Sequence, residues 1–304
     1  MSDEVRAALA AGGAVVALES TIFSRLGLPS PANAEALERC VRAVRDGGAV
    51  PALTVVLDGV AHVGVDASAH ERILDGDVRK VAARDIAVAT ARRWPVGATT
   101  VSASLTLAAA AGIAVFATGG IGGVHRGAAS TGDVSADLPA IASLPVVTVC
   151  AGAKAFLDLA RTLEWLETQS VPVLGWRADD LPAFYSRTSG LRVPHRVEEA
   201  DDVAAVVTAR RSLGQQGGVL VTAPIPEADE IPWTEISAVL DAALREADDA
   251  GVTGAAITPF VLGRIGAATA GRSVPANLAL AEHNAAVAAE IAVALSVSRR
   301  RTSR

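Results

Sequence analysis

The chain has 304 residues, of which 51% are hydrophobic and 3% aromatic, and its formal net charge is −6. The apolar content excludes an intrinsically disordered chain, and the acidic balance argues against a broad nucleic-acid-binding surface. The two cysteines, Cys40 and Cys150, lie outside any Cys-x-x-Cys or Cys/His cluster. Neither a disulfide framework nor a zinc site is therefore expected.

Lysine is almost absent: among 27 basic residues, only Lys80 and Lys154 are not arginine. Genome composition explains why lysines are missing, but it does not explain why these two remain. A buried lysine can lose its proton and act as a base or as a Schiff-base nucleophile, whereas arginine stays charged. Lys80 and Lys154 are therefore candidate functional residues.

No targeting segment is predicted, because the chain starts with the acidic sequence MSDE and its first apolar run is short. Residues 95–124 carry no charge and are long enough to span a bilayer. Their many hydroxyl residues and glycines favour a buried helix, a buried strand and a loop instead. We expect a cytoplasmic protein without a membrane or nucleic-acid partner.

Short apolar runs alternate with helical stretches along the chain. A strand is expected over 14–18, ending at Glu19, and a helix follows from an N-cap at Asn33 to the stop at Gly47 and Gly48. The remaining predicted elements are a hairpin of strands 51–57 and 60–65 around Asp58-Gly59, a helix at 99–111, a strand at 113–117, a glycine loop at 118–127, a strand at 146–150, a helix from about 155 to 167, strands at 171–174 and 219–222, and helices at 197–213, 234–250 and 275–297.

This alternation predicts an α/β fold with three layers, α/β/α, around a mixed, mainly parallel sheet. The hairpin adds an antiparallel pair to that sheet. No linker divides the chain, so residues 1–304 are expected to form one catalytic domain. The basic run at 299–301 places residues 298–304 in a frayed, solvated tail.

Several reactive side chains follow predicted strands, where open α/β sheets bind their ligands. Glu19 ends the first strand, and Lys154 follows the strand 146–150 after a four-residue turn. The loop after the strand 113–117 supplies His125 and Asp133. Glu is a poor helix cap, so Glu19 favours a functional interpretation over a capping one.

The glycine loop at 118–127 matches neither a dinucleotide fingerprint nor a P-loop. Its glycines would let backbone N–H groups approach an anion closely. The alternative is a mobile surface loop.

Asp133 and Asp137 bracket Ser135 shortly after this loop. One carboxylate together with water molecules suits a loosely held Mg²⁺ or Mn²⁺ ion. The alternative is that these carboxylates cap a helix N-terminus.

A series of motifs lies in order along nearly the whole chain. The most specific is FATGGIGGVHRGA at 116–128, and the others are VALESTI at 16–22, GATTV at 97–101, DVSADL at 133–138, VCAGAK at 149–154, LET at 166–168, PAFY at 182–185, PIP at 224–226, TPF at 258–260 and GRS at 271–273. Together they resemble the pseudouridine-5′-phosphate glycosidases, the indigoidine synthase A-like family.

The resemblance implies an α/β/α homotrimer that uses Mn²⁺ and reversibly splits pseudouridine 5′-phosphate into uracil and ribose 5-phosphate. Lys154 matches the family's Schiff-base nucleophile, Glu19 its proton donor and Asp133 its metal ligand. The positions that match substrate-binding or supporting polar residues are Lys80, Val101, Ser135, Ala136, Asp137, His125 and Asn277.

The bond that such an enzyme breaks explains these residue types. Uracil leaves through a carbon without a lone pair, so the paired-carboxylate route of ordinary glycosidases is poorly suited. A neutral Lys154 could instead take C1′ of the opened ribose as an imine, while Glu19 protonates carbon 5 of uracil.

The chain departs from the family pattern at several places. Arg25 lies in a segment where the family has a histidine, residues 81–85 lack a usual serine, Gly132 replaces a phenylalanine, and Ala223 replaces an asparagine. An imine-forming lyase or aldolase for another sugar phosphate or C-nucleoside is one alternative. A catalytically dead metal-binding regulator is another, although such a protein would not need Glu19, Asp133 and Lys154 together.

Overall fold

The computed structural model describes residues 1–252 and 257–302, whose strands form one sheet in the order β4-β5-β2-β1-β6-β7-β10-β8-β9, with β3 paired to β2. All pairs are parallel except β2–β3 and β2–β5. The strands are β1 (Val15–Leu18), β2 (Val50–Leu57), β3 (Val60–Val63), β4 (Arg79–Val81), β5 (Val96–Thr99), β6 (Val115–Ala117), β7 (Val147–Cys150), β8 (Val173–Trp176), β9 (His195–Val197) and β10 (Val219–Thr222).

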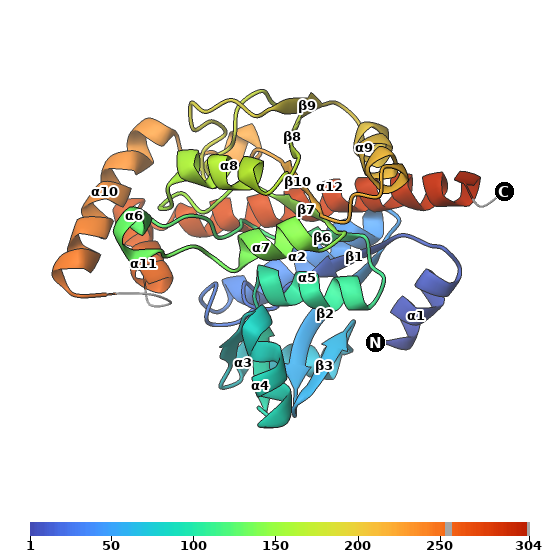
Figure 1. Cartoon of the computed structure of the whole chain (residues 1–304). Helices are drawn as coiled ribbons and strands as arrows, with labels where there is room; N and C mark the ends of the chain where they lie inside the picture. The colour runs from blue at the N-terminus through green and yellow to red at the C-terminus, as the bar shows by residue number, and fades with distance from the viewer. Residues whose placement is uncertain (253–256, 303–304) are drawn as a thin grey trace.

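Helices cover both faces of this sheet (Figure 1). Helices α2, α9 and α12 pack together on one face, and α5 and α7 pack together on the other. The helices are α1 (Asp3–Ala10), α2 (Ala32–Asp46), α3 (Ala67–Asp75), α4 (Ile86–Ala91), α5 (Val101–Ala110), α6 (Ala128–Thr131), α7 (Asp137–Ser143), α8 (Leu159–Thr168), α9 (Ala200–Ser212), α10 (Trp233–Asp249), α11 (Ile257–Ala268) and α12 (Ser273–Thr302), with short 3₁₀ turns η1 (Ala83–Asp85) and η2 (Glu227–Asp229).

The predicted fold class is confirmed: the structure is α/β/α with a mixed, mainly parallel sheet. Every residue of β1, β6, β7 and β10 is buried, as expected for parallel strands covered on both faces. These four strands lie side by side in the sheet and place their carboxyl ends at one edge. The candidate catalytic residues follow these ends.

Three strands were not predicted from the sequence: β4, β5 and β9, the last of which (His195–Val197) ends where a helix was expected to begin. β4 consists of Arg79, Lys80 and Val81, and its two charged residues hide the strand pattern. β5 lies at the start of the uncharged segment 95–124, where a helix was expected from Thr99. Instead Thr99 ends β5 and Thr100 is the N-cap of α5.

The expectation of a frayed tail at 298–304 is wrong as far as residue 302, because α12 continues to Thr302. The hydroxyl groups of Ser298 and Thr208 lie 3.2 Å apart, and Arg300 Nη2 donates to Gly12 O at 3.1 Å. These contacts tie the end of the helix to α9 and to the turn after α1.

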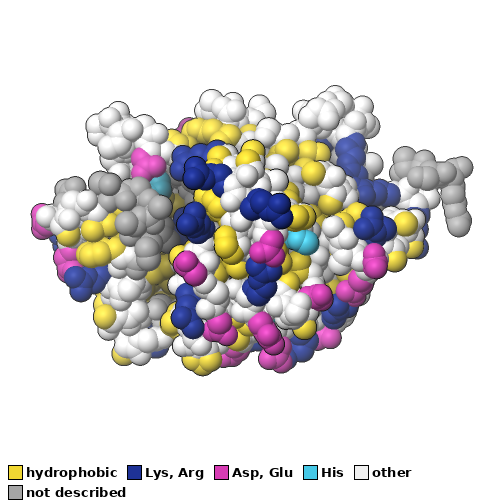
Figure 2. All heavy atoms as spheres, turned by 90° about the horizontal axis from the view of Figure 1, so that it is seen from below, with side chains coloured by type: hydrophobic (Ala, Val, Ile, Leu, Met, Phe, Trp, Pro, Cys, Tyr) yellow, Lys and Arg dark blue, Asp and Glu magenta, His cyan; other side chains and the backbone are white. Residues whose placement is uncertain are grey.

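Helix α12 is also long and apolar enough over Ser273–Arg300 to cross a membrane by length and composition. However, 67% of its most apolar window is buried inside the protein, as in the core helix of a folded domain. Figure 2 shows acidic and basic side chains interspersed on the face seen from below.

Candidate active site

Glu19 follows β1 directly and is buried, with 8% of its surface exposed. Thr118 follows the neighbouring strand β6, and its hydroxyl donates a short hydrogen bond to Glu19 Oε1. Burial raises the pKa of Glu19, because the charged carboxylate loses its water. Lys154, the Thr118 hydroxyl and Lys80 oppose that rise, whereas Asp137 adds to it.

The two lysines belong to segments on either side of β1 in the strand order, and both interact electrostatically with this carboxyl group. Lys154 follows β7, and its N–H donates to Ile121 O at 3.0 Å, so the glycine loop and the turn after β7 run side by side. Lys80 lies in β4 and is exposed at its surface. Its pKa is nevertheless lowered, mainly by desolvation and also by the charge of Lys154. Lys80 and Lys154 therefore share one electrostatic environment with Glu19 and Asp137.

A buried hydroxyl network joins the end of β1 to β2 and β5. Thr54 Oγ1 lies 2.9 Å from Thr99 Oγ1 and 2.8 Å from Ser104 Oγ, and Ser20 Oγ lies 3.1 Å from Thr99 Oγ1. All four residues are fully buried. Satisfied networks of this kind make a buried polar region rigid. Here the network holds the segment after Glu19 against β5, which in turn pairs with the strand that carries Lys80.

Asp137 connects two loops of the site. Its Oδ1 accepts from the N–H of Ser102 at 2.9 Å, and its Oδ2 accepts from the N–H of Gly122 at 2.8 Å. Asp137 therefore caps α5, although it is itself the first residue of α7. The capping interpretation is right for this carboxylate, but the helix that it caps is distant in sequence. Both oxygens already accept N–H groups, which makes Asp137 a poor metal ligand.

The remaining predicted substrate-binding positions surround Asp137. Val101 is the buried first residue of α5, and Ala136 is the exposed N-cap of α7. Ser135 Oγ accepts from the N–H of Asp137 at 3.2 Å, while its own N–H donates to Gly123 O at 3.0 Å. The segment 135–137 is thus held against the glycine loop.

The glycine loop is not a mobile surface loop over residues 118–124, and part of its backbone N–H groups are already bonded within the protein. Residues 118–124 are buried, and the N–H groups of Ile121, Gly122 and Val124 donate to other protein atoms. A Cβ on Gly120 would lie 2.5 Å from the Phe184 ring. The glycines are needed because side chains from neighbouring segments pack directly on this backbone.

Asp133 and His125 lie beside each other at the end of this loop. His125 Nδ1 is 3.7 Å from Asp133 Oδ2, and the side chains are 19% and 41% exposed respectively. Within the described residues, no group of three or more His, Cys, Asp or Glu side chains could hold a metal ion. The donor set at Asp133 fits a hard cation that keeps most of its water ligands, and it does not fit a closed metal cage.

Two asparagines of α12 complete the site. Asn277 is 6% exposed, and its buried Oδ1 has no hydrogen-bond partner within the described residues. Asn284 lies two turns further along the same face of α12. Its Nδ2 donates to Thr118 O at 2.8 Å and to Gly119 O at 3.1 Å. Asn284 was not predicted from the sequence. Its spacing of seven residues from Asn277 was the available signal, since residues i and i+7 share a helical face.

A buried carboxyl group shares one electrostatic environment with two amines at the carboxyl edge of an α/β sheet, the edge at which enzymes of this architecture bind their substrates. A model of the family described as "Indigoidine synthase A like protein" matches residues 4–294. The chain belongs to this indigoidine synthase A-like family.

Curated relatives and solved structures agree with this assignment. Pseudouridine-5′-phosphate glycosidase of Myxococcus xanthus is 49% identical over 295 residues, covering 96% of this chain and 97% of the relative. The protein of the same name from Methylobacterium nodulans is 50% identical over 301 residues, covering 97% and 88%. The structure of prealnumycin C-glycosynthase AlnA with ribulose 5-phosphate superposes with a TM-score of 0.91 at 36% identity, covering 99% of this chain and 97% of AlnA. An indigoidine synthase A-like protein of Thermotoga maritima gives a TM-score of 0.86 at 37% identity, with 94% of both chains covered.

The raised pKa of Glu19 predicts a pH-dependent gain in stability for Glu19→Gln. Between the ordinary value of 4.5 and the raised folded value, the folded state holds more protons than the unfolded state, so wild-type stability falls as pH rises. The uncharged glutamine does not suffer this loss. The free energy of unfolding by urea should be equal in both proteins near pH 4 and about 1–3 kcal/mol higher in Glu19→Gln near pH 8.

The matched control is Glu164→Gln, which makes the same change on an exposed position of α8. It should alter the free energy of unfolding by less than about 0.5 kcal/mol. A Glu19→Gln protein that is less stable than wild type near pH 8 would contradict the assignment of a destabilised buried carboxylate.

Proposed function

We propose that the chain cleaves the C–C glycosidic bond of pseudouridine 5′-phosphate to give uracil and ribose 5-phosphate, in a reversible reaction. The observation that carries this proposal is that Glu19 and Lys154 follow strands of one sheet edge and interact electrostatically. The names of the relatives at 49% and 50% identity support the choice of substrate. The bound ribulose 5-phosphate of AlnA supports a sugar phosphate as ligand.

Lys154 supplies the nucleophile in this proposal. Its Nζ lone pair forms a bond to C1′ while the bond from C1′ to the ring oxygen breaks, and that oxygen takes a proton. The resulting amine nitrogen then pushes its lone pair toward C1′ to form a C=N bond. Hydrolysis of this imine releases ribose 5-phosphate and regenerates the lysine. Partial burial of Lys154 after β7 limits the water around the amine.

Glu19 supplies the proton that lets uracil leave. When carbon 5 of uracil is protonated, the bond between C1′ and carbon 5 breaks, and its electron pair stays with the uracil ring. Because its pKa is raised, the Glu19 carboxyl group keeps this proton to a higher pH than an exposed glutamate does. The hydroxyl of Thr118 fixes the orientation of the carboxyl group.

The other polar groups bind and orient the substrate. Lys80 offers a cation beside the catalytic pair, and the unpaired Oδ1 of Asn277 offers an acceptor. His125 lies at the end of the glycine loop, with its ring centroid 6.3 Å from that of Phe156. Val101 and the segment Ser135-Ala136-Asp137 form the wall of the substrate site in this proposal.

A Mn²⁺ ion would be held by Asp133 together with water, as its exposed carboxylate allows. Such an ion supplies positive charge and oriented water molecules next to the uracil carbonyl groups.

A related reaction on another C-glycoside is the second candidate. AlnA, a C-glycosynthase by name, superposes on 99% of this chain with a TM-score of 0.91. This similarity supports a reaction at a C-glycosidic bond to an aglycone other than uracil. Uracil release from pseudouridine 5′-phosphate, followed by absorbance, distinguishes the two candidates.

The central prediction concerns the imine. Borohydride added with ribose 5-phosphate should reduce the imine to a stable amine, raise the intact mass by one reduced sugar phosphate and place the adduct on Lys154 by peptide mapping. Lys154→Arg keeps the charge but cannot form an imine. We expect this variant to fold, to give no adduct and to lose at least roughly 10⁴-fold in kcat.

Lys80→Arg is the matched control, because it makes the same change at the only other lysine. If Lys80 binds substrate as a cation, the variant should raise KM more than it lowers kcat, and the adduct on Lys154 should persist. An adduct on Lys80 would reverse the two roles, and an active Lys154→Arg enzyme would exclude the imine.

A second prediction concerns the metal. Dialysis against chelator should abolish turnover, and Mn²⁺ should restore it. Asp133→Ala should weaken Mn²⁺ binding, measured as free Mn²⁺ by electron paramagnetic resonance, and should lower kcat/KM about 100-fold or more. Asp75→Ala, which removes an exposed carboxylate that pairs with Arg25, should change neither measurement. Full activity of Asp133→Ala in chelator contradicts the metal assignment.

The family resemblance also supports a cytoplasmic homotrimer. Sedimentation velocity at micromolar concentration should give a species with three times the mass of one chain. A monomer under these conditions would contradict this part of the proposal.

A further inference from the structure

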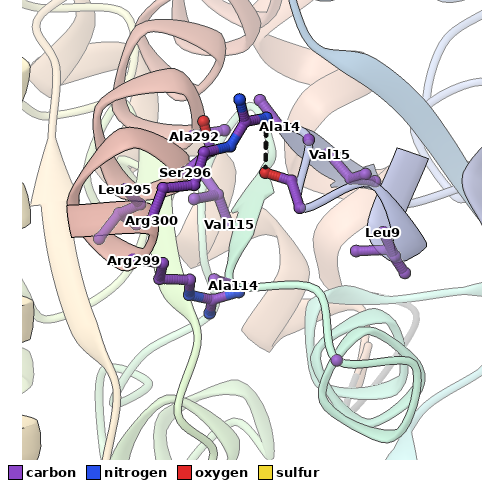
Figure 3. A pocket seen from close by; sticks show the side chains of 13 residues that line it. Leu9, Ala14, Val15, Ala114, Val115, Ala292, Leu295, Ser296, Arg299 and Arg300 are labelled. Carbon is purple, nitrogen blue, oxygen red and sulfur yellow. Dashed lines mark hydrogen bonds between the residues drawn. The ribbon is translucent and has the colours of Figure 1, made fainter. Parts of the chain in front are cut away.

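A cavity of about 360 Å³ lies at the sheet edge opposite Glu19 and Lys154 (Figure 3). Val15 and Val115, the first residues of β1 and β6, line it, whereas Glu19 and Thr118 follow the last residues of the same strands. The cavity is therefore separate from the candidate active site. Its volume lies within the range of small-molecule sites.

Small residues create this space. The turn between α1 and β1 contributes Gly12 and Ala14, and the turn between α5 and β6 contributes Gly112 and Ala114. Side chains this short leave a gap between the two turns and α12. The cavity is a feature of three segments that are distant in sequence, and α12 closes it from one side.

Helix α12 gives the cavity two chemically different parts. Ala292, Leu295, Ser296 and Arg299 follow the spacing i, i+3, i+4, i+7 and therefore share one face of the helix. The wall is thus apolar near Ala292 and Leu295 and becomes cationic at the end of the helix. Figure 3 shows Arg299 and Arg300 both extending along the cavity.

Both arginines line the cavity, as consecutive residues of α12. Arg300 donates to the carbonyl oxygens of Ala11 and Gly12, and it forms no ion pair within residues 1–252 and 257–302. Desolvation lowers the pKa of Arg211, and the charge of the nearby Arg299 lowers it further. Basic residues often complement the dipole at a helix C-terminus. The helix dipole alone, however, does not account for the cavity with apolar walls that lies next to these two arginines.

We propose that this cavity binds a compact organic anion. The apolar body of the ligand lies between α12 and the starts of β1 and β6, and its negative group faces Arg299 and Arg300. Guanidinium groups bind carboxylate, sulfonate and phosphate oxygens through charge-assisted hydrogen bonds. This site is distinct from the active site, because the two lie at opposite edges of the sheet.

Two fluorescent probes that differ only in charge test this proposal. Anilinonaphthalene sulfonate carries an anionic group on an apolar body, and phenylnaphthylamine has the same rings without the charge. In titrations of the full chain, Arg300→Gln should weaken the sulfonate probe about tenfold, the loss of one charged hydrogen bond, and should leave the neutral probe within about twofold. Arg161→Gln, the same substitution on an exposed position of α8, should change neither.

A cavity-filling variant provides the second arm. Ala114→Leu keeps both arginines and should weaken both probes, with circular dichroism as the check on folding. Ser296→Leu fills the same space from α12 if Ala114→Leu does not fold. Sulfonate binding that is unchanged by Arg300→Gln and by the filled cavity overturns the proposal. Displacement of the probe by ribose 5-phosphate also overturns it, because the probe would then occupy the active site.

Discussion

The site depends on keeping one carboxyl group out of water. Glu19 is 8% exposed, and this burial raises its pKa despite two lysines and the hydroxyl of Thr118. A buried ionisable group is costly unless its partners are held in place. The partners of Glu19 come from different strands and loops, so their positions require the whole sheet edge to be assembled. In the proposed reaction the same cost is useful, because a destabilised carboxylate holds its proton more tightly and can deliver it to the substrate.

The long strand β2 explains how the sheet satisfies this requirement. Its first four residues pair in parallel with β1, and its last three pair antiparallel with β5. The end of β5 at Thr99 is therefore brought beside the end of β1, although the two strands are not neighbours. Lys80 pairs in register with Ala98 of β5 and so reaches the level of Glu19. If β5 instead ran parallel to β2, its last residue would lie level with Leu57, the end of β2, and away from the end of β1.

Much of the fold could be predicted because its central strands are short apolar runs between turns. The positions of Glu19 and Lys154 followed from the rule that side chains after parallel strands gather at one edge. Lys80 could be singled out by composition, yet its strand could not, because pairing with β5 rather than local pattern makes Arg79–Val81 extended. Asp137 could be recognised as a capping residue, but the helix that it caps is set by the tertiary approach of α5 and the glycine loop. Asn284 likewise gains its role from two carbonyl groups that lie far away in sequence.

The departures from the family pattern lie in two kinds of place: on the surface, and next to residues of the candidate site. Arg25 makes an exposed ion pair with Asp75 at 3.2 Å. Gly132 directly precedes Asp133 and has a φ of +69°. Ala223 is buried, and its N–H donates to Cys150 O at the end of β7. Both positions have lost a larger side chain relative to the pattern, whereas Glu19, Lys80, Asp133 and Lys154 are all retained. Charged groups determine which bonds can break, and neutral walls determine what fits. The departures at Gly132 and Ala223 therefore bear on the shape of the site, whereas the groups on which the proposed chemistry depends are present.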